Sequence, residues 1–148
     1  MPDPCPVCSS ELKEKVEGLI ATQFRCPLCG EFVLSRELIS CLPYTVKADK
    51  VASAKLSHAI RTMQHKKKGT VLHIDTANEI LKRPLPTPRE QADLFIRWLA
   101  DNVEGPGETV WVEPATHRSI IGAKSDEGFG LVLRYLFDKG LVEGSLSE

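Results

Sequence analysis

The sequence predicts an α+β fold in which a small antiparallel sheet, held together by four cysteines, precedes a mostly helical domain. Three observations lead to this prediction. Two Cys-x-x-Cys pairs lie within the first 30 residues, with short apolar segments between and after them. Apolar residues recur at helical spacing from about residue 49 onward, and prolines punctuate residues 84–88. We therefore expect three parts, which are residues 1–34, 35–83 and 84–148.

The four N-terminal cysteines have the spacing of a metal site. Cys5 and Cys8 are separated by two residues, as are Cys26 and Cys29, and 17 residues lie between the pairs. Two residues between cysteines form a tight turn that aims both thiolates at one point, and Gly30 supplies the permissive backbone after the second turn. The pattern predicts one zinc ion. Because four thiolates leave no position for water or substrate, we expect a structural zinc; the alternative is four cysteines without a metal.

The segment between the two cysteine pairs predicts the small sheet. Lys13–Glu17 and Leu19–Phe24 predict a hairpin, and Glu31–Leu34 can add a third strand. With its two cysteine turns, this arrangement resembles a zinc ribbon. The next segment, Arg36–Leu42, predicts a short apolar helix, and we expect its lone Cys41 to lie in the hydrophobic core.

The segment from Asp49 to about His65 predicts a helix with an apolar face and a basic face. The apolar face, which we expect to be buried, comprises Ala52, Leu56, Ala59, Ile60 and Met63. The basic face, which continues into a run of lysines, comprises Lys50, His58, Arg61, His65, Lys66, Lys67 and Lys68. This basic face is either an ordinary solvated surface or a binding site for phosphate, nucleotide or nucleic acid.

Charge is unevenly distributed along the chain, although the net charge is only -1. Residues 49–83 carry 8 basic and 3 acidic residues, which gives +5, whereas residues 84–148 carry 6 basic and 11 acidic residues, which gives -5. Any contact with an anionic partner is therefore expected from the middle of the chain. No aromatic residue interleaves with the basic face, which argues against a stacking platform for single-stranded nucleic acid.

Helix-start signals organise the rest of the sequence. Val71–Ile74 predicts a short strand, and Thr76 with Glu79 predicts a capping box that opens a short helix. Thr87–Glu90 predicts a second capping box, followed by a core helix that ends near Gly105. Beyond it we expect a strand at Thr109–Val112, helices at Pro114–Ile121 and Ser125–Lys139, and a strand at Leu141–Glu143.

The order helix, strand, helix, helix, strand in the C-terminal part resembles a winged-helix fold. The passage Leu136–Val142 is similar to the segment by which winged helices enter their wing. This resemblance implies that Ser125–Lys139 takes the position of the recognition helix, which enters the major groove of DNA in DNA-reading relatives. Its first turn carries Asp126 and Glu127, whose carboxylates repel phosphates, so we do not expect this helix to read a groove.

The whole arrangement resembles the N-terminal region of prokaryotic effector proteins from defence systems. It combines the ribbon, the helical middle, the Pro-Arg-Glu-Gln-Ala-Asp segment and the endings Ile-Ile-Gly-Ala-Lys-Ser and Lys-Gly-Leu-Val. In those proteins a TIR-like or nucleoside deoxyribosyltransferase-like domain follows. The resemblance implies a non-catalytic sensing or docking region of a larger protein, with a protein or a nucleotide as its partner. The alternative is a DNA-binding transcriptional regulator that uses the basic middle helix.

The sequence contains no convincing catalytic arrangement. His117 has no adjacent partner, Ser119 lacks the glycine frame of a hydrolase nucleophile, and the glycines at 122–130 lack the Lys-Ser/Thr of a phosphate loop. We therefore expect no enzymatic activity. The chain has no apolar run of about 18 residues and no signal-peptide pattern at its start, so we expect a cytoplasmic protein outside the membrane. In that compartment five cysteines favour metal ligation over disulfides.

Overall fold

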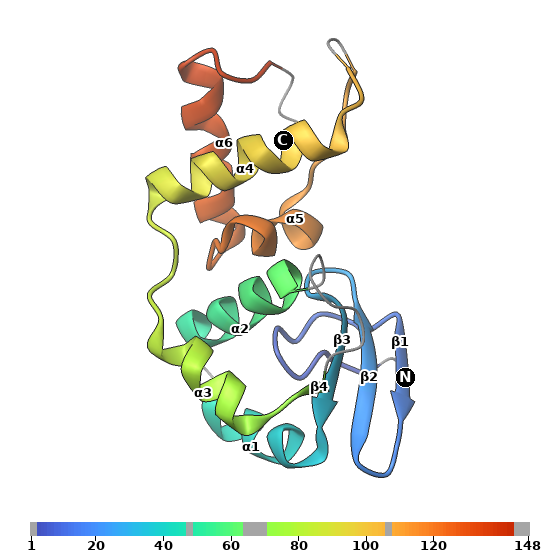
Figure 1. Cartoon of the computed structure of the whole chain (residues 1–148). Coiled ribbons are helices and arrows are strands. Elements are labelled where there is room, and N and C mark those ends of the chain that lie inside the picture. The colour runs from blue at the N-terminus through green and yellow to red at the C-terminus, as the bar shows by residue number, and fades with distance from the viewer. Residues whose placement is uncertain (1–2, 47–48, 64–70, 106–107, 144–148) are drawn as a thin grey trace.

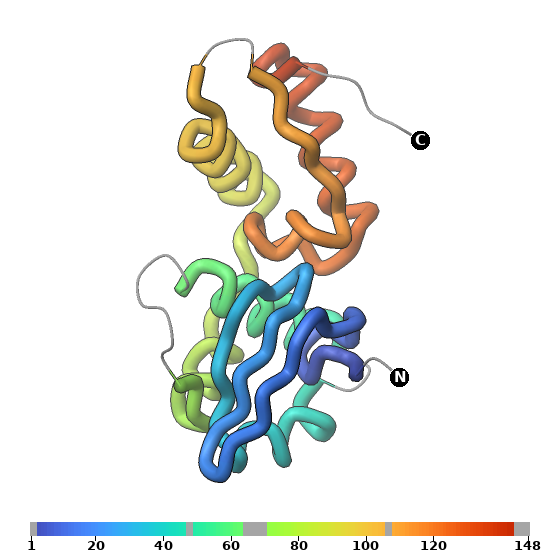
Figure 2. Tube along the Cα trace, turned by 90° about the vertical axis from the view of Figure 1, so that its right-hand side faces the viewer, coloured from blue at the N-terminus to red at the C-terminus, as the bar shows by residue number. Residues whose placement is uncertain are grey.

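The described residues of the computed structural model, 3–46, 49–63, 71–105 and 108–143, form an α+β fold (Figure 1). They contain four strands in the order β1-β2-β3-β4 and six helices, so the α+β class of the prediction is confirmed. The sheet and the first three helices form one end of the molecule, and the last three helices form the other (Figure 1, and Figure 2 from a second side). No helix within these ranges has the length and apolar character needed to cross a membrane.

The predicted antiparallel sheet is present near the N-terminus. Its three strands are β1 (Glu14–Glu17), β2 (Ala21–Cys26) and β3 (Gly30–Ser35). Buried and exposed residues alternate along β2, so one face of the sheet covers the core. Phe24 of β2 pairs with Phe32 of β3, and their rings stack with centroids 5.2 Å apart. Because Cys26 pairs with Gly30 at the end of this ladder, the sheet fixes the position of the second cysteine turn.

Three helices and one short strand pack with the sheet in a single hydrophobic cluster. These elements are α1 (Arg36–Val46), α2 (Lys50–Met63), β4 (Val71–Leu72) and α3 (Ile74–Lys82). On α2 the predicted core residues Ala52, Leu56 and Ile60 are buried, while Ala59 and Met63 are half-buried. Residues 35–83 and the ribbon therefore share one core. β4 runs parallel to β3, a pairing between segments far apart in the sequence.

Helix α1 differs from its prediction in two respects. The helix was predicted to end at Leu42, yet it continues through Pro43 for another turn. The prediction that Cys41 lies in the core is wrong, because its side chain is exposed. The core face of α1 is formed by Leu38, Ile39, Leu42 and Val46, and Cys41 lies about 115° from the mean direction of these four on a helical wheel. Helical phase, rather than residue type, decides its exposure.

Helix α3 begins earlier than its sequence signal indicates. Its N-cap residue is His73, which makes no side-chain capping bond, so the capping box predicted at Thr76 is wrong. The strand predicted for Val71–Ile74 is reduced to the two residues of β4. Ala77 N donates to the carbonyl of His73 at 3.0 Å, which shows that the first helical turn already includes Thr76.

The C-terminal part forms a second hydrophobic cluster from three helices, which are α4 (Pro88–Asn102), α5 (Pro114–Ile121) and α6 (Asp126–Asp138). The capping box of Thr87 and Glu90 is confirmed at the start of α4. Ser125 caps α6 by accepting a hydrogen bond from Gly128 N at 3.0 Å. Phe129 is fully buried at the centre of this cluster, with Phe95 of α4 edge-on to its ring.

The two strands predicted in the C-terminal part are not formed. Thr109–Val112 and Leu141–Glu143 are not strands, and the described residues place no sheet in this half of the chain. Val112 and Val142 instead pack individually against the helical cluster. The sequence signal was apolar character, which predicts burial, but a strand also needs a partner for its backbone. The winged-helix assignment is therefore not confirmed.

Candidate metal centre and adjoining cavity

The sulfur atoms of all four N-terminal cysteines gather in one place. They lie within 4.8 Å of one another, with 4.0 Å between the sulfurs of Cys5 and Cys29 and 3.4 Å between those of Cys8 and Cys26. Four sulfurs bound tetrahedrally at about 2.3 Å from one ion would be about 3.8 Å apart, which is close to these distances. They are far from the roughly 2.0 Å of a disulfide. The predicted ligand set therefore forms a cluster that could hold a metal ion.

Each cysteine pair lies in a turn that ends in the left-handed backbone region. The residue after the first pair is Ser9, with φ 68°, and the residue after the second is Gly30, with φ 89°. In the first turn Ser9 N donates to the carbonyl of Cys5 at 2.9 Å, and in the second Cys29 N donates to the sulfur of Cys26 at 3.4 Å. The conformation expected at Gly30 is confirmed, and a serine adopts it in the first turn.

Hydrogen bonds among the sulfurs raise the pKa of two cysteines of the cluster and lower the pKa of the other two. Hydrogen bonding with Cys26, together with burial, raises the pKa of Cys5 and of Cys29. The pKa of Cys8 is lowered chiefly by its hydrogen bond with Cys26, and the pKa of Cys26 is lowered chiefly by its hydrogen bond with Cys29. Four thiolates in one buried place need a cation to offset their charge. Metal binding at this site would therefore release protons.

Serine hydroxyls from two helices hold the backbone of both cysteine turns. Ser53 Oγ on α2 donates to the carbonyl of Val7, within the first turn, at 2.6 Å. Ser119 Oγ on α5 donates to the carbonyl of Leu28, within the second turn, at 2.5 Å. Ser119 is buried among the contacts between the two halves of the molecule. Sequence analysis missed both serines, because a helical serine has no motif that reveals its tertiary partner.

The second cysteine turn also joins the C-terminal helices to the ribbon. Arg61 of α2 donates to the carbonyl of Leu28 at 3.2 Å, beside the bond from Ser119. The carbonyl of Ser119 in turn lies 2.7 Å from His58 Nδ1 on α2. The end of α5 lies directly over α2 in the view of Figure 1. We call this set of contacts among Leu28, His58, Arg61 and Ser119 the joint.

The predicted basic face of α2 is divided by the joint. Lys50 is exposed, whereas His58 and Arg61 are half-buried and face backbone carbonyls. Burial lowers the pKa of the Arg61 guanidinium, and the charge of the nearby cysteine sulfurs acts in the opposite direction. The remaining predicted anion-binding residues, His65, Lys66, Lys67 and Lys68, lie outside the described residues. Anion binding by this face stays a prediction.

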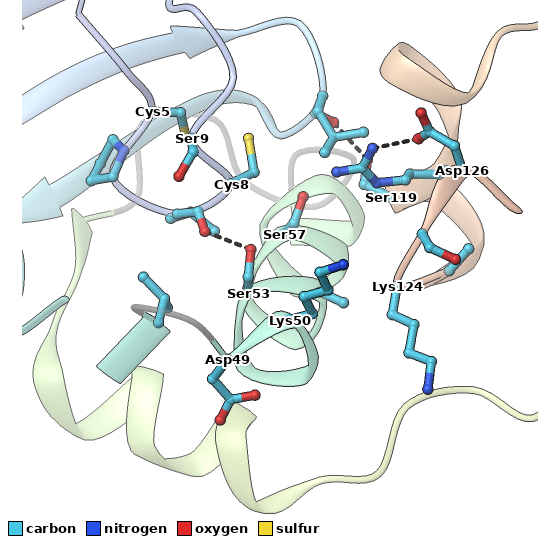
Figure 3. Close-up of a pocket in the computed structure, with 18 of the residues that line it drawn as sticks. Cys5, Cys8, Ser9, Asp49, Lys50, Ser53, Ser57, Ser119, Lys124 and Asp126 are labelled. Carbon is cyan, nitrogen blue, oxygen red and sulfur yellow. Dashed lines mark hydrogen bonds and ion pairs between the residues drawn. The ribbon is translucent and has the colours of Figure 1, made fainter. Parts of the chain in front are cut away.

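A cavity of about 730 Å³ opens beside the first cysteine turn (Figure 3). Its walls are the first cysteine turn, the N-terminal half of α2 and the passage from α5 to α6. Ser53, Ser57, Ser119, Lys50 and Lys124 are among the residues that line it (Figure 3). Ser57 also approaches the cysteine cluster, since its Oγ is 3.1 Å from the sulfur of Cys29. The cavity therefore adjoins the cysteine cluster and spans the two halves of the molecule.

Fold and site together define an α+β protein with a four-cysteine cluster that could hold a metal ion, next to a polar cavity. Comparison of the chain with protein families, characterised proteins and solved structures found no match. Its function has to be inferred from the geometry of its own residues.

Proposed function

We propose that the cysteine cluster binds one structural zinc ion. Thiolates are soft ligands, and a tetrahedral set of four sulfurs is typical of zinc or of iron–sulfur centres. Cysteine sulfurs would fill all four coordination positions, leaving none for water or substrate. The turns are held from outside by Ser53 and Ser119, as expected for a site that organises its surroundings.

Metal analysis of the purified protein tests this assignment. We expect one zinc per chain, lost in Cys26→Ser and retained in Cys41→Ser, because Cys41 lies apart from the cluster on the exposed face of α1. Iron in place of zinc, or equal zinc contents in the two variants, would contradict the assignment.

We also propose that the zinc-loaded chain is a recognition module without catalytic activity. The observation that carries this proposal is the cavity between the two halves of the molecule, whose walls are bonded to both cysteine turns. The metal would hold the two cysteine turns in place, and the turns would position α2 and α5 through the hydrogen bonds of Ser53 and Ser119. The cavity between these elements would then already be formed before a ligand binds. The best acid–base candidate, His117, packs edge-on against Trp98, and burial lowers its pKa. This is the kind of sensing or docking region that the resemblance to effector proteins implies.

Exchange of zinc for cadmium tests the link between metal and cavity, because cadmium is a larger thiolate-binding ion and should keep the fold. In amide NMR spectra we expect the exchange to shift Ser53 and Ser119 together with the cysteine turns. Asp101 and Arg134, on the far parts of α4 and α6, serve as controls and should not shift. Shifts confined to the ribbon would show that the metal does not organise the cavity, and the proposed function would be wrong.

A DNA-binding regulator is the second candidate, favoured by the charge of +5 on residues 49–83. Labelled duplex DNA would be titrated at low and moderate salt against the wild type and a variant with Lys66, Lys67 and Lys68 changed to Ala. A charge-matched control changes Lys13, Lys82 and Lys139 to Ala. Salt-sensitive binding lost only in the first variant would favour the regulator. An absence of binding at low salt would eliminate it.

A further inference from the structure

Each acidic side chain that lines the cavity lies beside backbone donors, a cation or the start of a helix. Asp49 Oδ1 caps the start of α2 by accepting hydrogen bonds from Val51 N at 3.1 Å and Ala52 N at 3.0 Å. Asp126 is paired with Arg118 at 2.5 Å. Glu127 lies in the first turn of α6, where the helix dipole offsets a negative charge. The lining holds three carboxylates and three cationic side chains, and each carboxylate lies beside a cation or at the start of a helix.

The lysines of the cavity differ from these carboxylates. Lys50 on α2 and Lys124 between α5 and α6 are exposed, and neither makes an ion pair or side-chain hydrogen bond with any residue that the structure describes. Both line the same cavity, Lys50 from α2 and Lys124 from the passage between α5 and α6 (Figure 3). Two uncompensated cations from separate elements therefore face one space, and an anion between them would satisfy both.

The rest of the lining favours a hydroxylated ligand. Ser125 Oγ accepts a hydrogen bond from Gly128 N, which leaves its hydrogen available to a ligand. Ser9, which is exposed, places a second hydroxyl at the rim. None of the described residues that line the cavity is aromatic, so these residues offer no ring on which a nucleobase could stack. Its volume of about 730 Å³ falls within the usual range for small-molecule sites.

We propose that this cavity binds a small sugar phosphate, with the phosphate between Lys50 and Lys124 and the sugar hydroxyls against the hydroxyls of Ser9 and Ser125. The inference rests on the proposed function, because it names the ligand class of the recognition module. Lysine suits this role, since its ammonium group binds phosphate as a compact point charge.

Calorimetric titration of the zinc-loaded full chain with ribose 5-phosphate tests the proposal, with ribose and inorganic phosphate as comparison ligands. We expect ribose 5-phosphate to bind, inorganic phosphate to bind more weakly, and ribose to give no signal. The double variant Lys50→Met, Lys124→Met should weaken binding by about tenfold or more. The charge-matched control Lys82→Met, Lys139→Met should bind as the wild type does, because both lysines lie outside the cavity. Zinc content and helix content would be confirmed for each variant.

Three outcomes would overturn the inference. These are no binding of ribose 5-phosphate at millimolar concentration, equal loss of binding in both double variants, and equal binding by ribose. The cadmium experiment separates this failure from failure of the proposed function. If cadmium still shifts Ser119 while ribose 5-phosphate does not bind, the sugar-phosphate inference is wrong and the recognition module stands. If cadmium leaves Ser119 unchanged, the module itself is wrong.

Discussion

Ser9 adopts a backbone conformation that is unfavourable for a serine. Its φ of 68° is in the left-handed region, where a side chain costs about 1 kcal/mol relative to glycine. We predict that Ser9→Gly raises the free energy of unfolding of the zinc-loaded protein by about 1 kcal/mol, measured by urea denaturation. The matched variant Gly30→Ser, at φ 89° in the second turn, should lower it by a similar amount. Changes of the same sign in both variants would contradict the prediction.

Gly122 is needed where α5 ends against the segment that leads into α4. It has φ +73°, and a Cβ atom there would lie 2.7 Å from Pro86 Cδ and 3.2 Å from His58 Cγ. We predict that Gly122→Ala destabilises the protein by more than about 1 kcal/mol, through strain and steric conflict. Gly130→Ala is the control, since a Cβ in this α6 position meets nothing within 4 Å and should stabilise the helix by about 0.5 kcal/mol or more. Thermal unfolding of both variants measures the contrast, and equal effects would count against this account.

The four cysteines of the candidate metal site could be predicted from the sequence, whereas the residues around them could not. The spacing of Cys5, Cys8, Cys26 and Cys29 is a local pattern, and local geometry is sufficient to bring such pairs together. The roles of Ser53 and Ser119 depend on helices that approach the cysteine turns from distant parts of the chain.

The capping box at the start of α4 is expected to stabilise that helix. Thr87 Oγ1 accepts from Glu90 N at 3.3 Å, and Thr87 N donates to the carboxylate of Glu90 at 3.0 Å. We predict that Thr87→Ala lowers the free energy of unfolding by about 1 kcal/mol. The pKa of Glu90 is lowered by its bond from the Thr87 amide, so its stabilising effect is present above the ordinary glutamate pKa and is lost as the pH falls through the lowered value.

Glu90→Gln provides the pH test of this capping box. Its thermal midpoint should fall less steeply than that of the wild type between neutral and acidic pH, because the titrating carboxylate is gone. Parallel curves for the two proteins would show that Glu90 does not contribute in its ionised form.

Helices with strong local signals were predicted well, and short strands were not. The capping box at Thr87 and the helical periodicity of α2 are local, and both agree with the structure. β4 exists because two residues meet the distant strand β3, whereas the equally apolar Thr109–Val112 meets no strand in the described chain. Strand formation depends on such partners, which a single segment does not specify.

At the scale of the whole molecule, the joint should connect the stability of the two halves. Ser119→Ala removes the hydrogen bond to the carbonyl of Leu28, and we predict a loss of about 1 kcal/mol of stability. Amide exchange should accelerate in α5 and in the second cysteine turn together. Ser40→Ala is the control, because its exposed hydroxyl bonds only within α1, to the carbonyl of Arg36. Faster exchange in α5 alone would contradict coupling through the joint.

The order of strands in the sheet also bears on how the protein resists aggregation. An open strand edge can pair with another molecule, and both outer strands of this sheet limit that pairing. β4 offers only two residues, and β1 consists of exposed Glu-Lys-Val-Glu, with Lys15 paired to Asp3 and Glu17. We expect Lys15→Val to increase light scattering during concentration or heating, since it removes the central charge of the β1 edge. Unchanged scattering would show that edge charge is not what keeps the molecules apart.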